Sequence, residues 1–277
     1  FADGAGRPLR LRLRLDVAVE ELHALRWETL RDPLDGLPLG HSPRRPLVRY
    51  IPSADLTVAA PGPRPALHAL VVVASPRDLG TYGLAEIDVG AEVARLRVAL
   101  GDISYTVVGQ HPDACLPHAT LAAIREGLQA EPTLLCLICH GRFINGESVL
   151  YLESDDGSIA PVQGSRLVEA LTQSDRRPLL VVLAACTTGG RSHDPGALAA
   201  LGPRLAREGS SAVVAMQDIF SFQSSSRFLP TLLAELRADG RIDRAVAVAR
   251  ASIQEAHDWW VPTLWLRVRD GRLWQTP

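Results

Sequence analysis

Lysine is absent from this chain of 277 residues, in which all 29 basic residues are Arg and 31 residues are Asp or Glu. The resulting net charge of −2 provides no basic surface of the kind that binds nucleic acid or an anionic membrane. No apolar run approaches the roughly 20 residues that a membrane-spanning helix needs. We therefore expect a cytoplasmic protein that binds neither nucleic acid nor a membrane.

Cysteine is scarce, with four residues at Cys115, Cys136, Cys139 and Cys186, all in or beside apolar stretches. Cys136 and Cys139 form a C-x-x-C pair, but the two residues between them continue an apolar run. This pattern favours buried thiols in a reducing compartment over disulfides. No other residues have the paired spacing of a zinc site, so we expect neither a metal nor a cofactor.

Methionine occurs only once, at Met216, and the chain begins at Phe1. We therefore expect a piece of a longer protein, with a regulatory domain upstream or a regulatory partner protein. What is present is ordinary for a globular fold: 47% of the residues are hydrophobic and 22% are charged. These fractions exclude disordered and collagen-like chains.

Apolar runs alternate with segments of helical periodicity through most of the chain. The runs predict six strands, over 68–74, 105–108, 134–139, 179–184, 212–216 and 263–268. Helices are predicted over 86–100, 116–129, 164–173, 196–207, 224–238 and 243–256, with a hairpin over 149–162. Such alternation is typical of an α/β fold with a mostly parallel sheet and helices on both faces.

The first quarter of the chain has a different character. It predicts strands over 9–15 and 47–51, a helix over 20–31 and a Pro-rich linker over 59–65. We expect residues 1–66 to form an N-terminal, strand-containing extension and residues 67–277 to form the core, as one domain overall.

Three loops follow the predicted parallel strands at the edge where ligands bind in such sheets. The first strand leads to Asp78, the third to His140 and Gly141, and the fourth to Cys186. If the third and fourth strands are neighbours, a spacing of roughly 5 Å brings His140 and Cys186 to the same rim.

A His beside a Cys is a chemically useful pair. An imidazole can accept the proton of a thiol, whose ordinary pKa of about 8.5 leaves it mostly protonated at neutral pH. The N–H groups of Gly141 and Cys186 are candidate donors to an oxyanion. The alternative is structural, because a Cys at the end of an apolar strand is often a core residue and a His there often has no chemical role.

Several strings in order along the chain resemble one family, the CHAT domains, which are caspase-like peptidase domains of bacteria related to separase. These strings are LRWETLRDP, LPLGHSPRRPLVRYI, VVVASPRDL, ICHG, VLYLESDDG, VVLAACTTGG, VVAMQ and WWVPTLWLR. The resemblance implies a caspase-like three-layer sandwich with a six-stranded sheet. It also implies a metal-independent cysteine endopeptidase with a protein substrate and a role in defence or cell death.

The resemblance assigns His140 as the general base, Cys186 as the nucleophile, and Gly141 and Cys186 as oxyanion donors. The segment after the fifth strand departs from the family pattern: its acid, Asp218, comes early, and Phe222 stands where the acid is expected. The substrate pocket is therefore left open between two alternatives. Asp218, together with Asp78, would bind an Arg side chain. Phe220 and Phe222 would instead line an apolar pocket.

Two other functions compete with a peptidase. A catalytically silent interaction or scaffold domain would keep the fold and bind a partner, but the intact His140 and Cys186 argue against it. A nucleotide-binding domain suits the fold class, but the chain lacks the motifs G-x-G-x-x-G and G-x-x-x-x-G-K-[ST].

Overall fold

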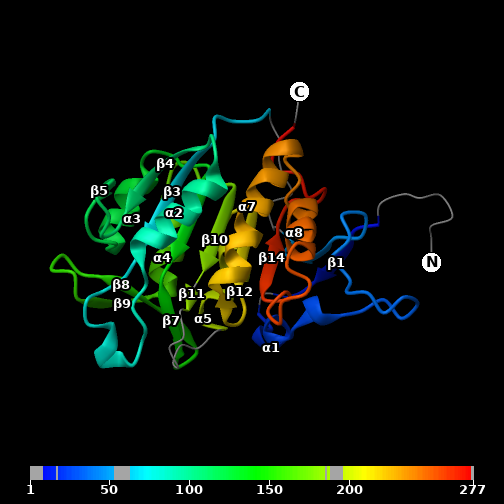
Figure 1. Ribbon diagram of the computed structural model, residues 1–277, viewed down its shortest axis with the longest axis horizontal. Coiled ribbons are helices and arrows are strands. Elements are labelled where there is room, and N and C mark those ends of the chain that lie inside the picture. The colour runs from blue at the N-terminus through cyan, green and yellow to red at the C-terminus, as the bar shows by residue number, and fades with distance from the viewer. Residues whose placement is uncertain (1–8, 17, 53–62, 185, 188–195, 276–277) are drawn as a thin grey trace.

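A computed structural model describes residues 9–16, 18–52, 63–184, 186–187 and 196–275 (Figure 1). For Cys186 and Thr187 the description is of the backbone. Residues 59–62 of the predicted linker lie outside the described ranges.

A nine-stranded sheet forms the centre of the fold, where six strands were predicted. Its order is β1-β2-β14-β12-β10-β6-β3-β4-β5. The strands from β12 to β5 are parallel to one another. On the other side of β12, β14 is antiparallel to β12 and parallel to β2. The predicted six are β14 (Pro262–Leu266), β12 (Ala212–Met216), β10 (Leu180–Ala184), β6 (Leu134–Ile138), β3 (His68–Val73) and β4 (Ser104–Val108). The sheet is larger because β5 (Ala114–Leu116) extends one edge, and β2 (Leu47–Tyr50) and β1 (Leu11–Arg14) extend the other.

Helices cover both faces of the sheet, so the predicted three-layer sandwich is confirmed. Alternate residues of β3 belong to opposite cores, with Val71 in one and Leu70 and Val72 in the other. One face is covered by α2 (Val89–Leu100), α7 (Phe222–Asp239) and α8 (Ile242–Ala251), which lie side by side in Figure 1. The other is covered by α3 (Leu121–Leu128), α4 (Gly164–Thr172), α5 (Gly196–Ala199) and α6 (Gly202–Arg207). Of the described helices, none combines the length and apolar character required to cross a lipid bilayer.

Two small sheets lie at the carboxyl ends of the central parallel strands, and the labels of β7, β8, β9 and β11 lie in the lower left part of the molecule in Figure 1. One consists of β7 (His140–Ile144), β8 (Glu147–Glu153) and β9 (Ile159–Gln163). The pairing of β8 with β9 confirms the predicted hairpin. The other consists of β11 (Cys186–Thr187) and β13 (Phe220–Ser221), which are parallel.

The single helix predicted over 20–31 is wrong, because the chain forms α1 (Glu20–Ala24) and a short 3-10 helix, η1 (Trp27–Thr29). The helix ends because Leu25 has an extended backbone. The two carbonyls that the break exposes, at His23 and Leu25, accept hydrogen bonds from the buried guanidinium of Arg49 in β2. The Arg49 side chain of β2 thus holds the segment around α1 and η1 against the sheet.

Candidate active site

His140 and Cys186 follow two neighbouring strands, and each lies the same number of residues beyond the end of its strand. In the register of β6 and β10, Ile138 pairs with Ala184, and the N–H of Cys139 donates to the carbonyl of Ala184 at 3.2 Å. His140 and Cys186 each lie two residues beyond this pair. Their backbones therefore leave the same edge of the sheet about one strand spacing, roughly 5 Å, apart. The third and fourth predicted strands are therefore neighbours, which is the condition under which the two residues reach the same rim.

The His140 imidazole is buried, with the residue only 1% exposed, and is held by a backbone carbonyl. Its Nε2 lies 2.7 Å from the carbonyl oxygen of Ala85. Because a carbonyl only accepts hydrogen bonds, this contact requires the proton on Nε2. In the neutral ring the basic lone pair is then on Nδ1. Ala85 lies between a 3-10 helix, η2 (Leu79–Tyr82), and α2.

Gly141 lies in a closely packed part of β7. It pairs with Leu150 of β8, and a Cβ atom there would lie 3.3 Å from the carbonyl oxygen of Val149 and 3.4 Å from Cβ of Ala197. An alanine would therefore be in ordinary contact with α5 and would require a shift of only a few tenths of an ångström at Val149.

The β11–β13 pair brings the segment after β12 alongside Cys186. Cys186 pairs with Phe220, whose side chain is fully buried and meets Phe228 edge to face at a ring-centroid distance of 5.8 Å. Phe220 therefore packs in the core. Of the two residues predicted to line an apolar pocket, only Phe222 has an exposed side chain. Phe222 remains 40% exposed, with the guanidinium of Arg95 over its ring at 5.7 Å.

Asp258 holds the start of α7 in place, and sequence reasoning missed it. Its carboxylate accepts from the N–H of Ser221 at 2.8 Å and from the hydroxyl of Ser224 at 2.5 Å, and the residue is only 2% exposed. Burial alone raises the pKa of Asp258, but the hydrogen bonds from Ser224 and Ser221 outweigh it, so the pKa is lowered. Asp258 comes directly before two Trp residues that carry no signal of a buried acid.

The two predicted acids lie apart and have separate partners. Asp78 accepts a hydrogen bond from the N–H of Ile159 at 2.7 Å, whereas Asp218 forms an ion pair with Arg26 at 2.8 Å. Asp78 follows β3 and Asp218 follows β12, with β6 and β10 between them. Three strand spacings separate these strand ends by about 14 Å, and a shared substrate guanidinium remains a prediction for the two acids.

Cys136 and Cys139 are free thiols on opposite faces of the sheet, in different hydrophobic cores. Burial raises the pKa of each to about 12. The prediction of buried thiols is confirmed for these two, whereas Cys115 is free and exposed. Within the described ranges, no three or more His, Cys, Asp or Glu side chains are grouped so that they could hold a metal ion.

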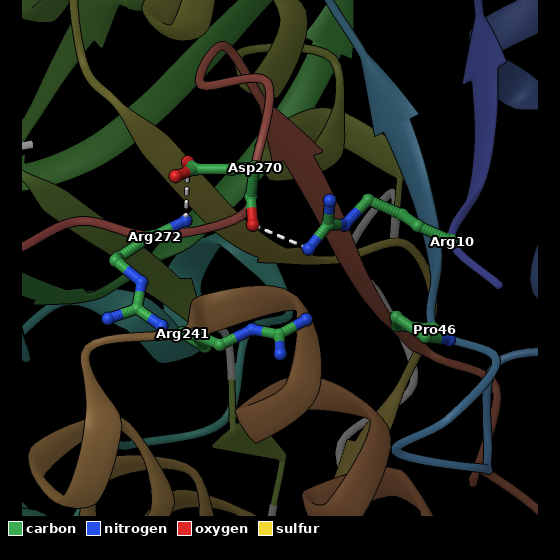
Figure 2. Close-up of a pocket in the computed structure, with 5 residues that line it drawn as sticks. All are labelled: Arg10, Pro46, Arg241, Asp270 and Arg272. Carbon is green, nitrogen blue, oxygen red and sulfur yellow. Dashed lines mark hydrogen bonds between the residues drawn. The ribbon is translucent and has the colours of Figure 1, made fainter. Parts of the chain in front are cut away.

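A cavity of about 350 Å³ lies elsewhere, among Arg10, Pro46, Arg241, Asp270 and Arg272 (Figure 2). In Figure 2 the Arg10 guanidinium donates to the backbone carbonyl of Asp270. The fully buried carboxylate of Asp243 forms ion pairs with Arg10 and Arg241 and so offsets their charge. None of the predicted site residues lines this cavity.

Comparison with known families finds one match, to the profile described as the CHAT domain, over residues 3–266. No curated protein sequence matches the chain. Among solved structures, the Arg-specific cysteine proteinase gingipain R aligns over 75% of this chain at 13% identity, with a TM-score of 0.46. The chain spans only 47% of that protein's length. Caspase-1 from Spodoptera frugiperda aligns over 79% of this chain and 96% of its own, at 16% identity and a TM-score of 0.46.

Proposed function

Because the chain belongs to the CHAT domain family, we propose that it is a caspase-like cysteine endopeptidase whose catalytic residues are His140 and Cys186. One observation carries the proposal. Both residues lie two positions beyond the paired ends of β6 and β10, so they leave the same edge of the sheet on adjacent strands. That edge of a parallel sheet is where such folds bind their ligands.

In the proposed reaction, Nδ1 of His140 takes the thiol proton of Cys186, because Nε2 already donates to the carbonyl of Ala85. The sulfur attacks the scissile carbonyl carbon and forms a C–S bond. The carbonyl electron pair moves onto the oxygen, where the N–H groups of Gly141 and Cys186 stabilise it.

The imidazolium then protonates the leaving amine as the C–N bond breaks, which leaves an acyl-enzyme. His140 next deprotonates a water molecule, which hydrolyses the thioester and restores the thiol.

The proposed substrate residue before the cut is Arg. Support comes from Asp218, which already binds a guanidinium, that of Arg26, at 2.8 Å. The same guanidinium lies 4.3 Å from the ring centroid of Trp260, so an acid and an aromatic face are arranged for one planar cation. Asp218 precedes β13 by two residues, and β13 pairs with the strand of Cys186. Phe222 belongs to the competing proposal of an apolar pocket.

The biological setting is also part of the proposal. We expect a protein substrate, and control by a further domain or a partner protein, in bacterial defence or cell death. The three cysteines whose side chains are described are free thiols, which supports a reducing compartment such as the cytoplasm.

Cleavage of a peptide library tests the proposal, with the protein assayed alone and together with the regulatory partner protein that we expect. Cys186→Ala and His140→Ala should each lower kcat/KM by at least about 10³-fold. Cys115→Ser, which removes an exposed thiol elsewhere, should leave it unchanged. Equal cleavage by wild type and Cys186→Ala would contradict the proposal. A lack of cleavage in both settings would favour the silent interaction domain.

A further inference from the structure

The proton position on His140 depends on where the Ala85 carbonyl lies. The Nε2···O distance is 2.7 Å, and the ring is almost fully enclosed. Without this contact the neutral ring would lose a hydrogen bond that favours the proton on Nε2 and the lone pair on Nδ1. The residues that hold Ala85 in place therefore influence the proton position on His140.

Ser75 fastens the segment that contains Ala85. Its hydroxyl oxygen accepts from the N–H of Ile87, two residues after Ala85, at 3.0 Å. Its own N–H donates to Oε1 of Glu153 at 2.9 Å. Ser75 lies two residues beyond the end of β3, so the two bonds hold the far end of the loop close to the central sheet.

Glu153 has a buried carboxylate that accepts hydrogen bonds from residues of three different loops. Its side chain is fully buried, and its two oxygens accept from Ser75 N–H, Gln110 Nε2 at 3.2 Å and Ala119 N–H at 3.0 Å. The ring of His118 approaches Oε2 at 3.3 Å. A carboxylate buried in this way is stable only because donors surround it.

Glu153 also belongs to the sheet that contains His140. It ends β8, and in the pairing of β8 with β7 Tyr151 stands opposite His140. The carboxylate thus joins the loop that holds the imidazole to the strand pair from which the imidazole projects. The result is a closed ring of contacts from His140 through Ala85, Ile87, Ser75 and Glu153 back to β8.

Two further bonds hold the same loop to the β8–β9 hairpin. The N–H of Arg77 donates to the carbonyl of Gly157 at 3.1 Å, and Oδ1 of Asp78 accepts from the N–H of Ile159 at 2.7 Å. Asp78, which is also a predicted residue of the substrate pocket, thus helps to hold this loop to β9.

We propose that Ser75 and Glu153 are positioning residues, which hold the Ala85 carbonyl against His140 and so fix the imidazole with its proton on Nε2. This inference rests on the proposed function for its consequence, the use of Nδ1 as the base. In this proposal both residues act through the Ala85 carbonyl and not on the substrate.

The direct test is the proton position on the ring, measured by long-range ¹H–¹⁵N spectra of protein with ¹⁵N-labelled histidine. The signals of His140 are identified by their loss in His140→Gln. Wild type should show the Nε2–H form, and Ser75→Ala should show a mixture of both neutral forms. Ser75→Thr, which keeps the hydroxyl, should resemble wild type.

Thr133→Ala is the matched control. Thr133 is also half-buried, and its hydroxyl oxygen accepts from one backbone N–H, that of His68, at 2.9 Å, but it lies at the amino end of β6. The control should leave His140 as in wild type. If Ser75→Ala does not fold, Ser75→Cys serves in its place, because it keeps the size and only a weak acceptor. An unchanged Nε2–H form in a folded Ser75 variant would overturn the inference.

Kinetics give the second readout. A misplaced base should lower kcat of Ser75→Ala by on the order of 10- to 100-fold with little change in KM, while Thr133→Ala retains wild-type kcat. If wild type cleaves no peptide, the proposed function fails, yet the spectra still decide whether Ser75 sets the proton position. The two failures are therefore distinguishable.

Discussion

Cys136 and Cys139 show how completely the side-chain environment decides the chemistry of a residue. Both lie within or directly after a strand that is buried on both faces, and each thiol has a pKa of about 12. The short spacing that resembles a redox or metal motif therefore places the two side chains in separate cores. Cys186 follows the adjacent strand by two residues and leaves the sheet at its edge.

We expect Cys136 and Cys139 in the native protein to resist iodoacetamide at pH 8, because only a thiolate reacts and both thiols are buried and protonated. Cys115 should react, since it is exposed. Mass spectrometry of the labelled peptides measures each site, and labelling in denaturant is the control. Rapid modification of Cys136 or Cys139 in the folded state would contradict the burial.

The same thiols predict a loss of stability in alkali. Their folded pKa is raised above the unfolded value of about 9, so the unfolded chain releases protons first as the pH rises. The two protonated thiols cost no stability below pH 9. Between about pH 9 and 12 the free energy of unfolding declines by up to about 1.4 kcal/mol per pH unit for each thiol. Urea unfolding at several pH values measures it, and Cys136→Ala should flatten the slope.

At the scale of elements, the periodicity of the sequence predicted the six central strands and most of the helices, because buried strands and amphipathic helices have distinct patterns. Short elements escaped prediction. β11 and β13 have two residues each, too few for any period, and form only because the ends of β10 and β12 bring them together.

β7 was missed although the sequence carries its signal. Asn145 and Gly146 have φ values of 52° and 80°, the left-handed backbone of a tight hairpin turn. Asn-Gly between two apolar segments predicts such a hairpin. Recognising it would have shown that His140 begins a second sheet rather than simply ending β6.

The candidate site was predicted in part for a similar reason. The strand ends that position His140 and Cys186 follow from the parallel pattern, whereas Ala85, Ser75 and Glu153 come together only through tertiary contacts. Asp78 and Asp218 both follow strands. The order of these strands in the sheet, which separates the two strand ends, cannot be predicted from local sequence patterns.

The η1 segment and the loop after β12 meet at the Arg26–Asp218 ion pair, which predicts a competition at the proposed pocket. Arg26 is largely exposed, so its pair with Asp218 contributes at most about 1 kcal/mol. Arg26→Ala should therefore lower KM for peptides with Arg before the cut by no more than about fivefold.

The matched measurement is Asp218→Ala, which should remove cleavage after Arg both in the wild-type protein and in the Arg26→Ala variant. Arg12→Ala serves as the control, because Arg12 is also exposed and also lies over an aromatic ring, that of Tyr50 at 5.3 Å. Unchanged cleavage after Arg in Asp218→Ala would exclude the acid as the selector and favour a pocket walled by Phe222.

At the scale of the whole molecule, one buried ionic cluster joins the first quarter of the chain to the rest. Arg49 in β2 contacts both oxygens of Glu28, at 3.1 and 2.6 Å, and donates to Oε1 of Gln217 at 2.9 Å. Arg250 of α8 lies 3.7 Å from Glu28. Glu28, Arg49 and Arg250 are each at most 2% exposed. The Glu28–Arg49 pair lies within the first 66 residues, and its contacts with Gln217 and Arg250 reach the rest of the chain. We infer from these contacts that the described residues of the two parts fold as one domain.

Arg49→Met should destabilise the protein by about 3–5 kcal/mol, because it leaves the Glu28 carboxylate buried without its main partner. Burial alone raises the pKa of Glu28, but Arg49, Arg250 and the hydrogen bond from Gln217 outweigh it and lower the pKa. The stabilisation is therefore present above the unfolded value of 4.5 and is lost as the pH falls through the folded value. The difference between wild type and variant should be largest near neutral pH and should narrow in acid.

Chemical unfolding followed by tryptophan fluorescence and by circular dichroism measures both the size of this effect and its cooperativity. Trp27 reports on the N-terminal segment, and Trp265, which is fully buried in β14, reports on the sheet. A single coincident transition in wild type is expected, because Arg49 ties the two parts together. Arg166→Ala removes an exposed ion pair with Glu169 and should change the free energy of unfolding by less than about 0.5 kcal/mol. Two separate transitions in wild type would show that the cluster does not join the two parts. An Arg49→Met variant no less stable than Arg166→Ala would show that the Glu28–Arg49 pair does not stabilise the fold.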